Sequence, residues 1–274
     1  MEKTEIQAHA KINLYLDVTG RRADGYHDIL SIMHEIPQAD VIRCSLSDKI
    51  SLNCSQPQIP VDGRNIAYRC AVRFFEETGI KGGVAIDIEK HIPCEAGMGG
   101  GSTDGAAVLR ALDALYDTGL TTEKLAEIGA GVGADIPFCV YGGTALCEGI
   151  GERITPLPPL SPDYMFCMVQ GADRISTAEA YTRIDALKNH TRLSRDELMR
   201  DYSAGRLHFY NIFENCIPEN SDVNRIKEIF AKYGVKSLMT GSGSAVFGIS
   251  DDKERLTAAC RELYGLFPYV SFEA

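Results

Sequence analysis

The segment Pro93–Thr103, PCEAGMGGGST, places four glycines directly before a run with helical apolar spacing that continues to Tyr116. Successive glycines let several backbone N–H groups converge on one point, and the N-terminus of a helix carries about half a positive charge. Ser102 and Thr103 add hydroxyl groups at the predicted start of that helix. This combination favours a phosphate site over its simpler alternative, a flexible loop with a serine cap.

Three common phosphate-binding motifs are excluded. No Gly-Lys-Ser or Gly-Lys-Thr occurs anywhere, so the loop is not a P-loop. The dinucleotide fingerprint G-x-G-x-x-G begins at Gly97 and Gly99, but Ser102 stands where its third glycine belongs. The H-R-D and D-F-G motifs of protein kinases are absent.

Two charged residues, Lys11 and Asp135, are candidates for a chemical role. Lys11 lies beside Asn13 on the polar face of an alternating segment, and Asp135 precedes Ile-Pro in GADIPF. Taken alone, Lys11 is typical of a solvated strand lysine, and Asp135 is typical of a turn or cap. Their chemistry follows only from a wider resemblance.

Composition limits the function classes. The 274-residue chain has a formal net charge of -10, which argues against nucleic acid and anionic membranes as partners and requires any anionic ligand to meet a local positive site. Nine scattered cysteines without a C-x-x-C pair, and the lack of a signal or transit pattern, indicate reduced thiols in the cytoplasm. No apolar run approaches the length of a membrane span.

The elements that must position these residues are of mixed type, which predicts an α+β fold. The segment 8–20 alternates and is expected to be a half-buried strand, with Lys11 and Asn13 on its polar face. A proline cluster at 156–164 suggests a boundary between domains 1–155 and 156–274. Further strands are expected at 41–47, 50–55, 83–93, 164–170 and 244–250, a hairpin at 142–155, and helices at 65–79, 102–116, 121–133, 176–187, 194–203, 222–234 and 252–265.

The glycine segment resembles the phosphate-binding signature P-x-x-x-G-L-G-x-x-S-S of the GHMP kinase superfamily, with Met98 in place of leucine and one extra glycine. AHAKINLYLDVTGRRADGYHDI, GADIPFCVYGGTALCEGIGE and MTGSGSAVFGI extend the resemblance over residues 8–248 and are most similar to a member that phosphorylates a cytidyl alcohol. The resemblance implies an N-terminal nucleotide-binding domain, a C-terminal ferredoxin-like α/β domain, and an active site between them. It also implies ATP and Mg²⁺ as cofactors.

The resemblance assigns roles residue by residue. Lys11 and Asp135 match the catalytic lysine and aspartate: the ammonium would keep the carboxylate ionised, so that it can orient and deprotonate a substrate hydroxyl. The ATP contacts it implies are Pro93, Cys94, Glu95, Ala96, Gly97, Met98, Gly99, Gly100, Gly101, Ser102, Thr103, Asn65 and Lys90.

On the substrate side, Tyr26 and Tyr181 would stack on the cytosine while His27 contacts its edge. The full set of implied substrate contacts is Asn13, Tyr26, His27, Thr177, Tyr181 and Gly241. No acidic magnesium ligand stands out, Ser102 is a candidate, and Glu95 is expected to point to solvent.

Two alternatives remain. Another GHMP kinase would act on homoserine, mevalonate or a sugar, but such small substrates do not need the aromatic residues of the GYH segment. A non-catalytic nucleotide-binding relative should lack Lys11 or Asp135, and both are present. A monomer and a homodimer are equally compatible with the sequence.

Overall fold

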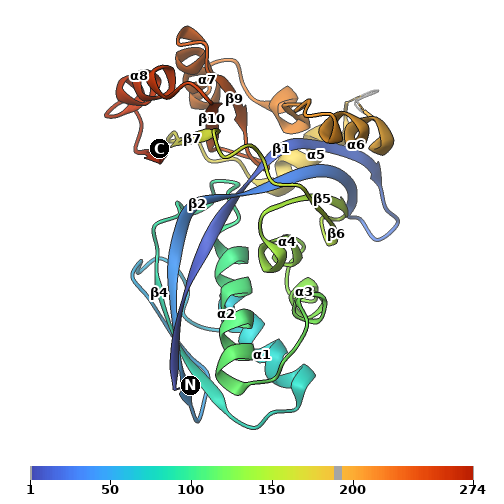
Figure 1. Ribbon diagram of the computed structural model, residues 1–274, viewed down its shortest axis with the longest axis vertical. Coiled ribbons are helices and arrows are strands. Elements are labelled where there is room, and N and C mark those ends of the chain that lie inside the picture. The colour runs from blue at the N-terminus through green and yellow to red at the C-terminus, as the bar shows by residue number, and fades with distance from the viewer. Residues whose placement is uncertain (1, 188–192, 274) are drawn as a thin grey trace.

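The computed structural model describes residues 2–187 and 193–273 and has two α/β halves joined by long strands (Figure 1). The larger half contains a seven-stranded sheet in the order β3-β4-β2-β1-β8, with β5 paired to β2 and β6 paired to β5. The smaller half contains a four-stranded sheet in the order β11-β7-β10-β9. The predicted α+β class is therefore confirmed.

The sheets draw on both halves of the sequence. The larger sheet consists of β1 (Lys3–Arg21), β2 (His27–Ser47), β3 (Ser51–Cys54), β4 (Gly83–Glu89), β5 (Thr144–Gly149), β6 (Arg153–Leu157) and β8 (Tyr210–Asn211). The smaller sheet consists of β7 (Met165–Gln170), β9 (Lys236–Met239), β10 (Val246–Ser250) and β11 (Tyr269–Glu273). The chain passes from one sheet to the other between β6 and β7, and β8 returns to pair with β1. A domain division at 155/156 stays a prediction.

The helices cover one side of each sheet. The central helix α2 lies within the curve of β1, β2 and β4, with α1 beside it, and α7 and α8 pack on the smaller sheet (Figure 1). The helices are α1 (Ile66–Thr78), α2 (Gly100–Tyr116), α3 (Thr122–Ala130), α4 (Ile136–Tyr141), α5 (Thr177–Asp185), α6 (Arg195–Ser203), α7 (Asp222–Lys232) and α8 (Lys253–Leu263), with a 3₁₀ turn η1 (Ile212–Cys216). Within the described residues, no helix combines the length and apolar character needed to cross a bilayer.

Local capping signals account for the helices that the sequence predicts. The Asn65 side chain accepts a hydrogen bond from the N–H of Ala67 at the start of α1, and Gly79 ends that helix with a φ of 69°. The Thr121 side chain caps α3 in the same way. All seven predicted helices are present, whereas α4, β8, β9, β11 and the part of β2 before Val41 were not predicted.

The expectation of a half-buried first strand is wrong. Lys11, Asn13 and Asp17 on the predicted polar face are 4%, 1% and 0% exposed. Helix α2 packs on β1, while Leu14 belongs to a core that includes Phe247 of the smaller sheet. Because β1 runs through the junction between the two halves, it is covered on both faces, and a local alternation of residue types cannot reveal that.

The predicted strand 83–93 ends earlier, at Glu89, because Lys90 enters a buried ionic cluster. Its ammonium contacts Asp40 of β2 and lies 2.8 Å from a carboxylate oxygen of Asp104 on α2. The other Asp40 oxygen accepts the N–H of Ile92 at 2.8 Å. This Lys90 cluster therefore fastens the entry of the glycine loop to the first turns of the helix that leaves it.

One lysine cannot neutralise two buried carboxylates. Burial disfavours the charge on Lys90, but the two carboxylates outweigh it and raise the Lys90 pKa. Burial raises the pKa of Asp104 to about 8, against the opposing effect of Lys90. Within the described part of the chain, Oδ1 of Asp104 has no hydrogen-bond partner. Burial therefore favours the protonated, uncharged form of Asp104.

This protonation predicts a pH-dependent stability. Between the ordinary aspartate pKa of 3.8 and about 8, the unfolded chain loses the Asp104 proton while the folded chain keeps it, so stability falls as the pH rises. The asparagine of Asp104→Asn is neutral at every pH, so this variant should not lose stability in this way as the pH rises. In thermal melts from about pH 5 to pH 8, the Tm of the wild type should fall relative to that of the variant.

The control is Asp87→Asn, which replaces an exposed aspartate of β4. Its Tm should follow the wild type at every pH. If the plots of Tm against pH for wild type and Asp104→Asn run parallel, Asp104 is ionised in the folded protein.

Candidate active site

A cavity of about 1230 Å³ lies between the two halves. Its walls are the glycine loop, the middle of β1, the turn at 241–243, the turn between β1 and β2, and helix α5. Segments from both ends of the chain thus meet at one place. The predicted site residues that line the cavity are Lys11, Asn13, Tyr26, His27, Glu95, Gly97, Gly99, Ser102, Asp135, Thr177, Tyr181 and Gly241.

Nine residues predicted to contact ATP are not among those that line this cavity. Met98 and Ala96 are buried, and the Thr103 hydroxyl donates to the carbonyl of His9. Asn65 caps α1, and the ammonium of Lys90 is held by the buried cluster described above. The others are Pro93, Cys94, Gly100 and Gly101.

Lys11 and Asp135 form the ion pair that the resemblance implies. The Lys11 ammonium lies 3.4 Å from Oδ2 of Asp135, and the two side chains are 5% and 34% exposed. Asp135 precedes α4, but its side chain makes no capping hydrogen bond to that helix. The carboxylate is therefore available both to Lys11 and to a ligand in the cavity.

Asn13 holds the Lys11 ammonium in place. Its Oδ1 accepts hydrogen bonds from Nζ of Lys11 at 3.0 Å and from the N–H of Gly241 at 3.1 Å. The Thr240 hydroxyl lies 3.3 Å from this oxygen and 3.3 Å from the carbonyl oxygen of Gly97. Its Nδ2 donates to the Ser31 hydroxyl at 2.9 Å. The amide thus connects the lysine of one half to the glycine turn of the other.

The glycine loop lies against that turn without intervening side chains. A Cβ on Gly97 would lie 2.2 Å from the Thr240 carbonyl oxygen, and a Cβ on Gly241 would lie 2.9 Å from the carbonyl oxygen of Gly97. Backbone hydrogen bonds join Lys11 to Met98 and Ala245 to Ala96 at 3.0 and 3.1 Å. The loop is therefore fixed between β1 and the turn. At Gly97 and at Gly241 the neighbouring backbone leaves no room for a Cβ, so only glycine fits at these two positions.

The same loop directs the N-terminus of α2 toward the cavity. Gly99 precedes the helix with a φ of 73° and has no side chain to cap it. The first N–H groups of a helix lack partners within the helix and bind anions well. Because Gly99 and Ser102 both line the cavity beside Lys11, the geometry fits a phosphate group there.

The opposite end of the cavity is aromatic. The His27 ring stacks on Tyr181 with centroids 4.7 Å apart, and Phe213 meets Tyr181 edge-on at 5.0 Å. Burial, with a smaller effect of the Asp135 charge, raises the pKa of Tyr181 to about 12. Tyr26 is 61% exposed. The structure therefore pairs Tyr181 with His27, and a base stacked on both tyrosines stays a prediction.

Lining residues that sequence reasoning missed include four with charged or polar side chains. They are the cations Arg21 and Arg174, Asp185, which lies 2.7 Å from Nε2 of His27, and Ser242, whose hydroxyl lies 2.8 Å from that of Thr177. Asp185 and Arg174 lie in segments without a recognisable motif. Only the assembled fold brings them to the site.

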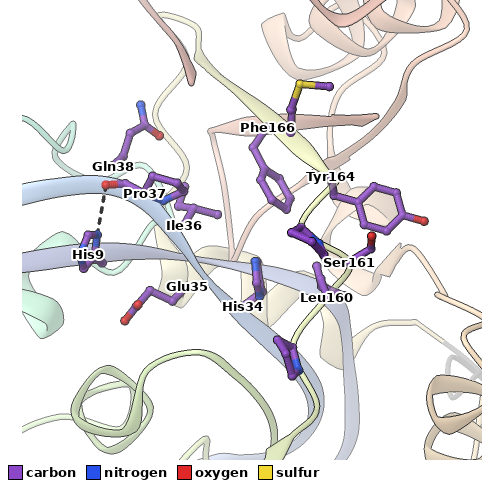
Figure 2. Close-up of a pocket in the computed structure, with 13 residues that line it drawn as sticks. His9, His34, Glu35, Ile36, Pro37, Gln38, Leu160, Ser161, Tyr164 and Phe166 are labelled. Atoms are coloured by element: carbon purple, nitrogen blue, oxygen red, sulfur yellow. Dashed lines mark hydrogen bonds between the residues drawn. The ribbon is translucent and has the colours of Figure 1, made fainter. Parts of the chain in front are cut away.

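A second cavity, of about 600 Å³, lies between β2 and the connection that leads to β7. Figure 2 shows the rings of His34 and Phe166 facing each other there, and His9 bonded to the carbonyl of Pro37. Burial lowers the pKa of His34 to about 4, so this imidazole is neutral. None of the predicted site residues lines this cavity.

The charges of the larger cavity do not favour a free polyanion. Its side chains include the cations Lys11, Arg21 and Arg174, opposed by Glu95, Asp135, Glu179 and Asp185. Glu95 is exposed, as expected, but it also lines the cavity. Among the described residues, no cluster of three or more His, Cys, Asp or Glu side chains could hold a metal ion. A bound triphosphate would therefore need backbone N–H groups and its own cation.

The comparisons with known proteins agree with this geometry. The family profiles described as GHMP kinases N terminal domain and GHMP kinases C terminal match residues 65–143 and 184–268. A protein of Clostridium tetani named 4-diphosphocytidyl-2-C-methyl-D-erythritol kinase is 42% identical over 252 residues, which cover 89% of this chain and 90% of the relative. The chain belongs to the 4-diphosphocytidyl-2-C-methyl-D-erythritol kinase family of the GHMP kinases.

Other matches extend over nearly the whole chain. A protein of the same name from Clostridium perfringens, strain ATCC 13124, is 39% identical and covers 97% of this chain and 95% of its own length. A crystal structure of 4-(cytidine 5'-diphospho)-2C-methyl-D-erythritol kinase is 31% identical, with a TM-score of 0.79 and 98% of both chains covered. The mevalonate kinase of Methanococcus jannaschii, 16% identical with a TM-score of 0.74 and 98% and 96% covered, shares the fold alone.

The glycine loop gives a prediction for this family member. Gly99→Ala adds a Cβ 3.0 Å from Cγ of Lys11 at a φ of 73°, which crowds the carbon chain that carries the ammonium and strains the loop. The left-handed backbone alone costs about 1–2 kcal/mol. We expect a modest loss of Tm without ligand, and less than half of the wild-type thermal shift on addition of ATP.

Gly119→Ala is the matched control, because Gly119 has a φ of 62° and no atom lies within 4 Å of its added Cβ. It should lose similar stability and keep the full ATP shift. If Gly99→Ala shows the same rise in Tm with ATP as the wild type, the ATP phosphates do not bind at this loop.

Proposed function

We propose that this protein transfers the γ-phosphoryl group of ATP to the 2-hydroxyl of 4-diphosphocytidyl-2-C-methyl-D-erythritol, in the non-mevalonate synthesis of isoprenoid precursors. One observation carries the proposal. The Lys11–Asp135 ion pair lies in a cavity that has a phosphate-type loop at one end and an aromatic recess at the other. The identity of the substrate is inferred from the names of the relatives.

The ATP phosphates would be bound by backbone N–H groups of the loop 93–103 and by the N-terminus of α2. This assignment is supported by the fixed backbone at Gly97 and by the position of Gly99 beside Lys11. Lys90 and Asn65 remain proposed for the adenosine side. Because the Lys90 ammonium is held by Asp40 and Asp104, we propose that Lys90 acts on that side indirectly, by holding the loop that would bind the nucleotide.

Mg²⁺ fits this site as a companion of the nucleotide. Mg²⁺ is usually held by substrate phosphates, waters and one or two protein oxygens. The Ser102 hydroxyl, in the first turn of α2 and on the cavity wall, is the protein group that we propose for it. The ion would neutralise charge on the transferred phosphoryl group, which the nearly balanced side-chain charges of the cavity do not.

The chain's own residues account for the rest of the chemistry. Asp135 would accept a hydrogen bond from the substrate hydroxyl, orient it toward the γ-phosphorus and take up its proton. Lys11 lies within reach of the same centre and would offset the negative charge on the phosphoryl oxygens. Asn13 keeps the ammonium pointed at Asp135.

At the other end of the cavity, Tyr26, His27 and Tyr181 would hold the cytosine, with Thr177 and Gly241 on the path to the phosphates. Arg21 and Arg174 are placed to meet the diphosphate of the alcohol. The alternative, a homoserine, mevalonate or sugar kinase, leaves this aromatic recess without a role. We further propose a cytoplasmic monomer or homodimer that binds neither nucleic acid nor membranes.

The direct test is a coupled assay of ADP release with a panel of acceptor alcohols. The cytidyl alcohol should be turned over, and homoserine, mevalonate and galactose should not. Turnover of one of these small alcohols in its place would contradict the proposed substrate while leaving the kinase assignment intact.

The ion pair gives the next prediction. Asp135→Asn keeps the shape of the side chain but removes its basic carboxylate, so turnover should fall by at least ~100-fold while the dissociation constant of ATP changes little. Lys11→Ala should also lower turnover sharply. Because the two residues serve one step, the double variant should lose much less than the product of the two single losses.

Asp196→Asn controls for the loss of a carboxylate, since Asp196 is 92% exposed on α6. It should retain wild-type turnover. Independent, multiplicative losses in the Lys11 and Asp135 double variant would show that the two side chains do not act together.

A further inference from the structure

A hydrogen-bonded group joins the two halves at the aromatic end of the cavity. One carboxylate oxygen of Asp185, at the end of α5, lies within hydrogen-bond distance of Nε2 of His27, at 2.7 Å. Its other oxygen lies 3.2 Å from the guanidinium of Arg21. Arg21 ends β1 and His27 begins β2, so Asp185 holds both ends of the turn between these strands against α5.

This contact decides which imidazole nitrogen carries hydrogen. An ionised carboxylate can only accept hydrogen bonds, and the Arg21 guanidinium beside it favours the ionised form. Nε2 of His27 must therefore be the N–H donor. In the neutral ring Nδ1 is then the nitrogen with the lone pair, and it can only accept.

The ring is also held in one plane. The His27 side chain is 9% exposed and stacks on Tyr181 with an angle of 21° between the rings. Phe213 supports Tyr181 edge-on. A ring held by stacking on one face and by a carboxylate at one nitrogen presents its remaining nitrogen in a defined direction.

We propose that Asp185 is a positioning residue that makes the site selective for cytosine over uracil by fixing the Nε2–H tautomer of His27. The inference rests on the proposed function, because it concerns the base of that substrate. Cytosine carries an amino group at position 4, which donates to an accepting Nδ1. Uracil carries a carbonyl oxygen there, whose lone pairs would oppose that of Nδ1.

The test compares two acceptor alcohols that differ only in the base, 4-diphosphocytidyl- and 4-diphosphouridyl-2-C-methyl-D-erythritol, at pH 8 with saturating ATP. The wild type should favour the cytidyl alcohol in kcat/KM by at least about tenfold. Asp185→Asn supplies an amide that can accept from or donate to Nε2, so both tautomers become available. Its preference should fall by at least about fivefold, chiefly through a lower KM for the uridyl alcohol.

Two variants separate the tautomer from other effects of losing a charge. Asp28→Asn removes the carboxylate next to His27 in sequence, which pairs with Arg22. Glu179→Gln removes another carboxylate of α5 that lines the cavity, and it leaves the carboxylate of Asp185 on His27. Both should keep the wild-type ratio between the two alcohols. A ratio that falls equally in all three variants would reduce Asp185 to a general electrostatic role and overturn the proposal.

The nitrogen-15 spectrum of the histidine rings reads the tautomer directly in the folded wild type. His27 should show a protonated Nε2 and an unprotonated Nδ1, and Asp185→Asn should show a mixture of both forms. An Nδ1–H tautomer in the wild type would contradict the inference. Failure of the wild type to phosphorylate the cytidyl alcohol would instead contradict the proposed function, so the two failures are distinguishable.

Discussion

The Oδ1 atom of Asn13 is the point on which the site depends. It accepts hydrogen bonds from the Lys11 ammonium and the Gly241 N–H, it lies 3.3 Å from the Thr240 hydroxyl, and Asn13 is 1% exposed. A buried donor left without a partner costs about 1–3 kcal/mol. One acceptor shared by donors of both halves therefore favours a single arrangement of β1 and the glycine turn at 240–245.

The rest of the machinery follows from that arrangement. The turn lies against Gly97, so its position fixes the glycine loop, and the loop directs the N-terminus of α2 at the cavity. The Lys90 cluster holds the other side of the same loop through Asp40 and Asp104. Lys11, the glycine loop and Asp135 are thus joined by one set of contacts, whereas His27 and Asp185 form a second contact between the halves at the aromatic end of the cavity.

Features with a local cause could be predicted from the sequence. The Asn65 and Thr121 side chains cap their helices by accepting hydrogen bonds from nearby backbone N–H groups. The glycine loop is recognisable from its composition alone. The Lys11–Asp135 pair came from resemblance, because local spacing cannot show that β1 meets α4. The burial of Lys11, the Lys90 cluster and the contact of Asp185 with His27 depend on segments far apart in sequence, so no local pattern predicts them. Lys90 in particular looked like a ligand contact, and its partners are two buried carboxylates.

The kinetic constants of Asn13→Ala test this account most directly. Asn13 is expected to contact substrate, and its hydrogen bond to the Lys11 ammonium also allows it to orient that group. Orientation predicts that kcat falls by at least ~30-fold while KM for the cytidyl alcohol changes less than about threefold, because the loss lies in the transition state. A large rise in KM with kcat nearly unchanged would mean that Asn13 mainly binds the alcohol, and would contradict the account.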